Sequence, residues 1–225
     1  TETLRGRRAE ARRHYERLSA ILAACGDAGA AELASAQAYL ARAAAADGRA
    51  AEAEELFTRA LPVLAQSGDV LSRGNVLLDL ANLRLEARDA AGAEARAREV
   101  LALAGATPRQ RAVATSVLAA ALRARGKPAD ALAGFDEALR ILSDEPADST
   151  SFSRALHEGR ARSLADLGRR AESAAAWVRT LDVARDVAAR ASDALSEPER
   201  LATVARFRRA LDGLLATAAA DPTDA

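Results

Sequence analysis

Hydrophobic residues recur along this chain at three- and four-residue intervals, which is the spacing of one face of an α-helix. Short turns containing Gly, Asp or Pro interrupt the pattern, and the segments between them predict ten helices. We expect these helices near residues 7–25, 29–46, 49–66, 70–87, 89–104, 108–125, 128–143, 149–167, 169–193 and 197–218. The polar segment 143–150 predicts one long loop, and residues 221–225 are expected to be disordered.

The predicted helices pair into a unit that repeats about every forty residues. A sequence motif that begins at Gly6 recurs at Gly48 and, slightly altered, at Gly168. When the internal turn of each unit is taken as its anchor, the anchors are separated by 42, 40, 38 and 42 residues and are Gly6, Gly48, Arg88, Gly126 and Gly168. Periodicity of this kind is typical of a solenoid, which grows by stacking similar units.

Equivalent positions of the units carry side chains of similar size. The fifth residue after each anchor is small, namely Ala11, Ala53, Ala93, Ala131 and Ser173. The ninth residue is aromatic in four of the five units, as Tyr15, Phe57, Phe135 and Trp177, and is Ala97 in the other. We interpret both positions as contacts between packed helices, with the small residue allowing close approach.

Residues at the predicted helix ends agree with this division. Asp, Thr or Ser at an N-cap position, or Pro at the first helical position, predicts helix starts at 26–27, 68–69, 107–108 and 196–199. Pro62 instead falls inside a predicted helix, where it should produce a kink.

These motifs resemble the tetratricopeptide repeat (TPR): a Leu-Ala pair before the turn glycine, then a small residue and an aromatic residue at fixed offsets. The match is most specific from Gln37 to Leu61 and from Thr115 to Leu139, and the second unit departs from it at Arg84 and Arg88. A period near 42 residues is similar to the long bacterial type found in MalT and STAND regulators, in peptide-sensing regulators and beside CHAT protease domains. The resemblance implies an all-α, right-handed α-solenoid of helix-turn-helix repeats that binds a partner in a concave groove.

We expect a single superhelical domain over residues 1–220. It would comprise a partial repeat at 1–26, repeats at about 27–68, 69–106, 107–146 and 147–194, and a C-terminal capping helix at 197–218. The capping helix is expected to cover the apolar face of the last repeat, and its apolar stripe is Leu201, Val204, Phe207, Leu211 and Leu215.

The repeat register also predicts which residues face the groove, because first helices line it in the family that this chain resembles. Residues six, nine and ten positions before each anchor should face the groove, among them Gly159. Arg123, three positions before its anchor, and Asn75, one turn above Asp79, should join them. The predicted partner-binding residues are Tyr39, Arg42, Asn75, Asp79, Asn82, Ser116, Arg123, Glu158 and Arg162. Arginines and asparagines in a groove suit a peptide or protein segment, through charge-assisted hydrogen bonds; an ordinary solvated helix face is the alternative.

The amino-acid composition limits the expected partners and the expected location of the protein. Thirty-two basic residues balance thirty-two acidic ones, so we expect neither nucleic acid nor an anionic membrane as a partner. The single cysteine is compatible with a reducing compartment, and we expect a cytoplasmic protein. Because the chain has no methionine, we interpret it as a processed chain or a fragment of a larger bacterial protein.

Catalytic and metal motifs are incomplete in this sequence. His14 and Cys25 are eleven residues apart on one predicted helix, roughly 16 Å along its axis, which is too far for a dyad. His157 and Glu158 begin like a zinc-binding HExxH motif, but Ala161 stands where the second histidine is required. We therefore predict no enzyme, no metal site and no cofactor.

The sequence favours a non-catalytic protein-interaction scaffold. The alternative is a ligand- or peptide-sensing regulatory domain of a STAND-type or transcription-regulator protein, in which binding would change the pitch of the superhelix. Self-association into a homodimer through the terminal helices is a further possibility.

Overall fold

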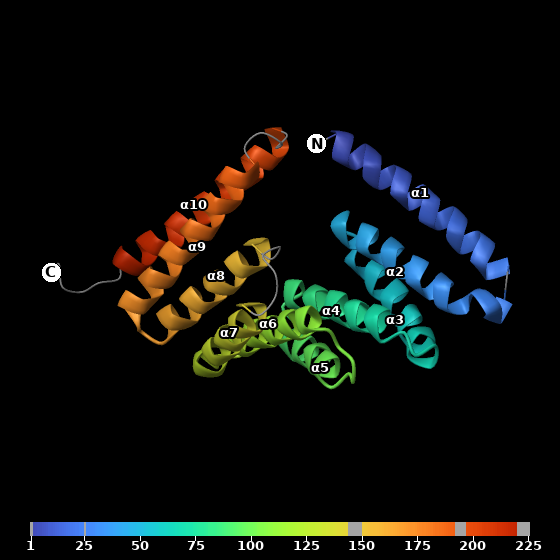
Figure 1. The fold of residues 1–225 in the computed structure, drawn as a ribbon, viewed down its shortest axis with the longest axis horizontal. Coiled ribbons are helices and arrows are strands. Elements are labelled where there is room, and N and C mark those ends of the chain that lie inside the picture. Colours follow the sequence, from blue (N-terminus) through green and yellow to red (C-terminus); the bar gives the residue numbers. More distant parts are fainter. Residues whose placement is uncertain (1, 25, 144–149, 192–196, 220–225) are drawn as a thin grey trace. The chain divides into compact units, whose positions relative to one another are not determined.

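The computed structural model is all-α. It describes residues 2–24, 26–143, 150–191 and 197–219, and within these ranges it contains ten α-helices, one short 3₁₀ segment and no strand (Figure 1). The helices are α1 Glu2–Ala24, α2 Ala30–Ala46, α3 Ala50–Gln66, α4 Val70–Glu86, α5 Ala90–Leu101, α6 Pro108–Ala124, α7 Pro128–Ser143, α8 Thr150–Asp166, α9 Arg170–Ala191 and α10 Glu197–Ala219. The 3₁₀ segment, η1, is Gly26–Gly29.

The ten predicted helices are confirmed, most of them to within three residues at each end. Helix α1 begins earlier than predicted, at Glu2, so Gly6 lies inside a helix and the predicted turn there is wrong. Helix α3 continues through Pro62 to Gln66. Most of the predicted loop 143–150, the proposed capping box at Ser196 and the tail 221–225 lie outside the described residues.

The predicted cap at residues 26–27 is wrong. Gly26 has the left-handed φ of 62° that ends a helix, but the chain then forms the 3₁₀ turn η1. Helix α2 starts only after Gly29, which acts as N-cap without a side-chain hydrogen bond. This 3₁₀ turn occupies the residues between α1 and α2. The N-cap of α2 therefore lies two residues downstream of the predicted position, residue 27.

The four described internal turns share one backbone arrangement. In each, the residue after the anchor donates to the carbonyl five residues earlier, as Arg49 does to Ala44 and Arg169 to Leu164, both at 2.9 Å. The anchor itself donates three residues back, which completes a Schellman motif and requires a positive φ. Three anchors are glycines with φ of 73–79°, whereas the fourth, Arg88, adopts φ 62°.

Replacing Arg88 with glycine should stabilise the protein by about 0.5–1 kcal/mol. A side chain at positive φ crowds the backbone, and glycine relieves this crowding at some cost in unfolded-chain entropy. Arg88→Ala keeps Cβ and should bring no such gain. Urea denaturation of both variants tests this, and equal stability of the two would contradict strain at this turn.

The start of α6 is held by a network around Gln110. Thr107 and Gln110 form a reciprocal capping box, with each backbone N–H donating to the other's side chain at 3.1 Å. The Gln110 amide also donates to the Leu71 carbonyl at 2.9 Å and to Asn75 Oδ1 at 3.0 Å. Helix α4 accommodates this amide at Gly74, where a Cβ would lie 2.5 Å from Gln110 Nε2. Asp69 and Asp89 likewise cap α4 and α5 through the backbone N–H groups of Ser72 and Gly92.

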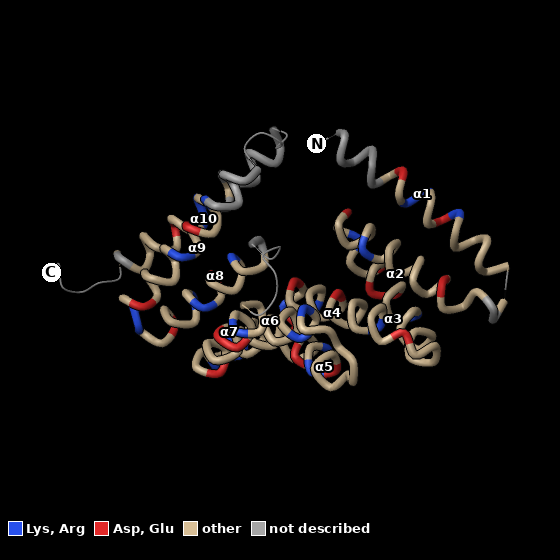
Figure 2. The backbone as a smooth tube through the Cα atoms, viewed as in Figure 1, with Lys and Arg blue, Asp and Glu red and all other residues tan. Residues whose placement is uncertain are grey.

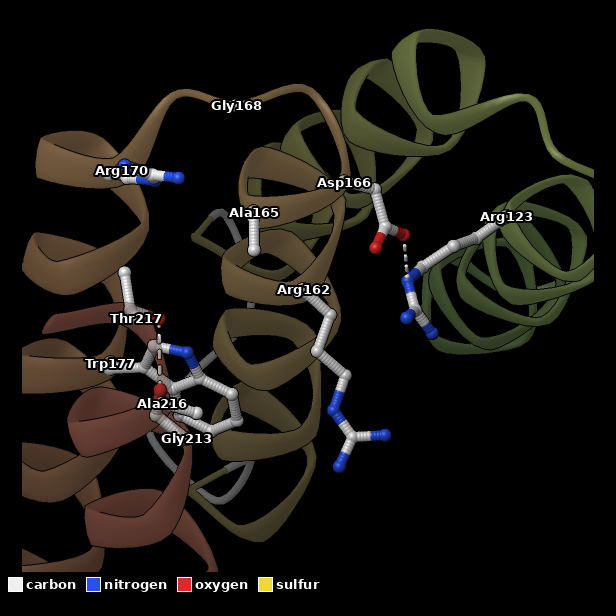
Figure 3. A pocket seen from close by; sticks show the side chains of 10 residues that line it. All are labelled: Arg123, Arg162, Ala165, Asp166, Gly168, Arg170, Trp177, Gly213, Ala216 and Thr217. Atoms are coloured by element: carbon white, nitrogen blue, oxygen red, sulfur yellow. Dashed lines mark hydrogen bonds and ion pairs between the residues drawn. The ribbon is translucent and has the colours of Figure 1, made fainter. Parts of the chain in front are cut away.

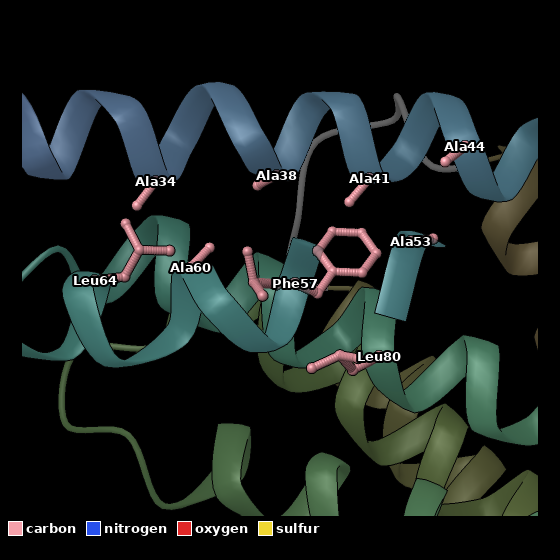
Figure 4. Close-up of a cluster of buried hydrophobic side chains, with 10 residues drawn as sticks. Ala34, Ala38, Ala41, Ala44, Ala53, Phe57, Ala60, Leu64 and Leu80 are labelled. Atoms are coloured by element: carbon pink, nitrogen blue, oxygen red, sulfur yellow. The ribbon is translucent and has the colours of Figure 1, made fainter. Parts of the chain in front are cut away.

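The chain divides into two compact units, Thr1–Gln110 and Arg111–Ala225, each with its own core. In the first unit four alanines of α2 pack against side chains of α3 and α4 to form the core (Figure 4). Phe57 lies fully buried at its centre, and the predicted small residue Ala53 is also fully buried. The buried residues of this core are Ala34, Ala38, Ala41, Ala44, Ala53, Phe57, Ala60, Leu64, Val76 and Leu80.

The second unit has two apolar clusters, each built around an aromatic ring that packs on a glycine. Phe135 packs on Gly159 of α8, where a Cβ would come within 2.3 Å of the ring. Trp177 packs on Gly213 of α10, where the corresponding distance is 2.4 Å. Gly159, which the register assigned to the groove, therefore lies against the ring of Phe135.

Helix α10 covers Trp177, but not with the predicted stripe. Ala210 and Thr217 are buried, and Leu214 packs against the Trp177 cluster. Leu211 and Leu215 are instead 46% and 64% exposed. Small residues let α10 approach the indole closely. The buried face of the helix is therefore shifted by one residue from Leu211 and Leu215. Leu201 and Val204 lie outside the side chains that the structure describes.

Candidate functional site

The first unit brings four of the predicted groove residues together on α2 and α4. Arg42 Nε donates to Asp79 Oδ2 at 2.6 Å, and the Arg42 guanidinium lies 5.2 Å from the centre of the Tyr39 ring. Arg42, Asp79 and Asn82 line a cavity of about 240 Å³ whose apolar wall includes Phe57. Burial raises the pKa of Asp79, although Arg42 opposes the shift. These contacts form a polar, partly exposed cluster above the core.

Tyr39 has an aromatic partner at a position that was predicted to pack between helices. Its ring stacks on Tyr15 of α1, with centroids 4.6 Å apart and planes inclined by 11°. Tyr15 is only half-buried, unlike Phe57, Phe135 and Trp177 at the same offset, and Tyr39 is 48% exposed. The stack thus presents an aromatic surface next to Arg42.

Two predicted groove residues already have partners within the fold. Asn75 Oδ1 accepts the hydrogen bond from Gln110, and Ser116 Oγ donates to the Val113 carbonyl at 2.7 Å. Both interactions fix local structure. We therefore give these two side chains a smaller role in recognition than the arginines.

In the second unit, the predicted residues Arg123 and Arg162 line a cavity of about 340 Å³ (Figure 3). Arg123 Nε donates to Asp166 Oδ2 at 2.7 Å. Arg162 Nη2 donates to Glu158 Oε1 at 2.6 Å, and Glu158 also pairs with Arg154 at 3.1 Å. Arg123, Arg162 and Asp166 line the cavity, and the ring of Trp177 contributes its apolar wall.

The register rule missed Arg170 in this cavity, because that residue belongs to α9, a second helix. It also missed Glu86, which lines the cavity of the first unit. With these residues included, the second-unit cavity is lined by three arginines and one carboxylate, whereas the first-unit cavity has one arginine and two carboxylates. The two cavities therefore differ in the sign of their charge.

Charged residues elsewhere are interspersed along the helices rather than segregated (Figure 2). Exposed pairs such as Arg12 with Glu16 and Arg140 with Glu137 lie within single helices. Across the described ranges no group of three His, Cys, Asp or Glu side chains could hold a metal ion. No helix in the described part of the chain has an apolar stretch long enough to cross a bilayer.

His157 is a partly buried titratable group on α8. Burial lowers the pKa of this imidazole, and Arg160 and Arg179 lower it further, while Asp136 raises it. The unfolded chain therefore binds the proton at a higher pH than the folded chain does. The associated stability is present above the ordinary histidine pKa of 6.5 and is lost as the pH falls through the folded-state pKa.

The melting temperature should accordingly fall between pH 7.5 and pH 5.5, and should fall less in a His157→Asn variant. This interval lies above the ordinary carboxylate range, so His157 dominates the difference between the two proteins. Thermal unfolding followed by circular dichroism measures both. Identical losses would show that His157 titrates alike in the folded and unfolded chains.

No protein-family model matches this chain, and no curated protein matches it either. Solved structures do match it. A putative kinesin light chain from Podosopora anserina, described as having nearly identical TPR-like repeats, has a TM-score of 0.61 and 22% identity over 82% of this chain and 90% of that chain. BtubC (BKLC) from P. vanneervenii has a TM-score of 0.67 and 17% identity over 96% and 87%.

PilF from Pseudomonas aeruginosa matches over 93% of this chain and 90% of that chain, with a TM-score of 0.53 and 19% identity. The fold is a TPR-like helical repeat. At these identities the likeness concerns the fold alone, and it confirms the all-α repeat solenoid that the spacing of anchors and aromatics predicted.

Proposed function

We propose that this protein is a non-catalytic interaction scaffold that binds a peptide or protein segment in a groove lined by first helices. TPR-like solenoids present extended concave surfaces suited to such binding. The observation that carries the proposal is that Arg42, Asn82 and Arg162, at the same offset in three of the repeats, line two cavities that also have apolar walls. Apolar walls with a few convergent polar groups are typical of binding sites.

The groove residues proposed for partner binding are Tyr39, Arg42, Asp79 and Asn82 in the first unit and Arg123, Glu158 and Arg162 in the second. Asn75 and Ser116 support the local structure beside them. The proposal includes a single domain over residues 1–220, a cytoplasmic location in a bacterium, and no cofactor, nucleic acid or membrane as ligand.

A second proposal follows from the repeat length. Periods of 38–42 residues are similar to the long repeats of STAND-type and peptide-sensing regulators, so the chain could serve as the sensing part of such a protein. In that case its ligand would be a small peptide or another domain of the same protein. Self-association through the terminal helices is compatible with either role, because Leu18 on α1 and Leu211 and Leu215 on α10 are exposed.

Affinity capture from a lysate of the parent organism tests the scaffold role. The bait is compared with a variant that carries Arg42→Ala, Asn82→Ala and Arg162→Ala. A control with Thr58→Ala, Arg59→Ala and Arg179→Ala removes the same number of charges from exposed positions outside both cavities. We expect a partner that the bait and the control capture and the groove variant loses.

The groove variant should remain folded. The Arg42–Asp79 pair is about one-third exposed, and removing such a pair costs no more than about 1 kcal/mol. Circular dichroism verifies this before capture. A partner retained by the groove variant would contradict groove binding, and capture of no partner would favour the sensing role.

A further inference from the structure

The cavity of the second unit draws its cationic side chains from three helices. Arg123 comes from α6, Arg162 from α8 and Arg170 from the first turn of α9. Asp166 is the only carboxylate among its lining residues, and the cavity has a volume of about 340 Å³. The described lining therefore carries a net charge of about two positive units, within a chain whose formal net charge is zero.

The arginines retain hydrogen-bonding capacity toward a ligand. A guanidinium has five N–H donors. In the described structure Arg123 directs its Nε to Asp166 and Arg162 directs one Nη to Glu158, so further donors remain on both. The Arg170 side chain forms no hydrogen bond or ion pair with any other described residue, and it is exposed. Arg170 is the cation best placed to gain a new carboxylate partner.

The cavity also has an apolar wall. Trp177 is 4% exposed and packs on Gly213, while Thr217 directs its hydroxyl to the Gly213 carbonyl at 2.8 Å. Ala165 and Ala216 complete this wall. As Figure 3 shows, the indole and the arginines lie around one cavity. Such a surface suits a short aliphatic side chain next to a charged one.

We propose that this cavity binds an acidic segment of the partner protein. An Asp or Glu carboxylate is held by Arg162 and Arg170, and a neighbouring aliphatic side chain packs against Trp177. This inference rests on the proposed scaffold function and specifies the chemistry of its ligand. Charge-assisted hydrogen bonds from arginine to carboxylate supply both affinity and orientation.

The arrangement favours a peptide carboxylate over a polyanion. The described helices carry no continuous basic stripe that a multiply charged phosphate backbone could follow (Figure 2). The first-unit cavity, with Arg42 against Asp79 and Glu86, repels the same acidic segment. Charge complementarity of this kind contributes specificity.

The chain provides its own probe, because Trp177 is the only tryptophan. Its fluorescence is titrated with an acetylated and amidated peptide of three Glu residues alternating with two Leu residues. A matched peptide has Gln in place of Glu, and neither absorbs where tryptophan is excited. We expect a saturable emission change with the Glu peptide, a higher Kd at higher salt, and no saturation with the Gln peptide.

The variants Arg162→Gln and Arg170→Gln should each raise the Kd at least about tenfold. Arg179→Gln removes an exposed arginine that lies on α9, like Arg170, but does not line the cavity. This variant should leave the Kd unchanged. Circular dichroism spectra and melting temperatures show whether all three variants remain folded.

Several outcomes would overturn the inference. They are equal affinity for the Glu and Gln peptides, an unchanged Kd in the Arg162 and Arg170 variants, and no binding at millimolar peptide. Saturation by inorganic phosphate or a single-stranded oligonucleotide at lower concentration than by the Glu peptide would assign the cavity to another class of anion. If affinity capture still yields a groove-dependent partner in any of these cases, the scaffold function stands and only the acidic ligand is wrong.

Discussion

Truncating Phe57 to alanine is expected to lower the free energy of unfolding by about 3–5 kcal/mol. The ring is fully buried, and the residues around it are largely alanines, among them Ala38, Ala41 and Ala53. Their short side chains cannot extend into the space that the ring leaves, so the cavity persists after substitution. The lost dispersion contacts and the retained cavity therefore act in the same direction.

Urea denaturation of the wild type and the variant measures this effect. The control is Leu71→Ala, because Leu71 is 56% exposed and its carbonyl, which accepts from Gln110, is kept. This control should change stability by no more than about 0.5 kcal/mol. Comparable losses in the two variants would show that Phe57 does not form the centre of this core.

Replacing Gly159 with alanine should destabilise the protein by about 1–3 kcal/mol. A Cβ at this position would lie 2.3–2.8 Å from three ring atoms of Phe135, and the ring is 5% exposed within its cluster. Helix propensity alone predicts the opposite sign, a gain of about 0.5–1 kcal/mol for Gly to Ala. We expect the steric effect to outweigh the gain in helix propensity, because the buried ring of Phe135 has little space into which it can move.

The sign of the change in melting temperature decides between these two effects. Making the Gly159→Ala change in a Phe135→Leu background isolates the effect of the aromatic ring. A leucine side chain does not reach the positions of the ring atoms that face Gly159. There the cost of Gly159→Ala should shrink, which a double-mutant cycle reports as a coupling energy. A higher melting temperature for Gly159→Ala in the wild-type background would refute the close contact.

Local signals determined most of the fold. Helix boundaries were predictable because anchors such as Gly48, Gly126 and Gly168 require positive φ, and because Asp69 and Thr107 satisfy free N–H groups at helix starts. Local rules were insufficient at Gly26, where the intervening 3₁₀ turn shifted the cap of α2 to Gly29. The boundaries that were predicted correctly depend on neighbours within one turn of the chain, and these neighbours can be read directly from the sequence.

The candidate site was predictable only in part. The register selected Arg42, Asp79 and Asn82, which the structure places on one cavity, and Arg123 and Arg162, which it places on another. It missed Arg170, because a rule built on first helices does not include a residue in the first turn of a second helix. It also could not show that Asn75 is engaged by Gln110, which is 35 residues away.

The sequence by itself determined the helices, the turns that join them and the repeat that relates them, because each depends on local backbone geometry and on side-chain size at a fixed period. The tertiary structure decided which residues meet across helices. It placed Gly159 under Phe135 and Gly213 under Trp177, and it turned Leu211 and Leu215 outward. Contacts of this kind depend on how closely two helices approach, and that distance is set by the packing of both partners together.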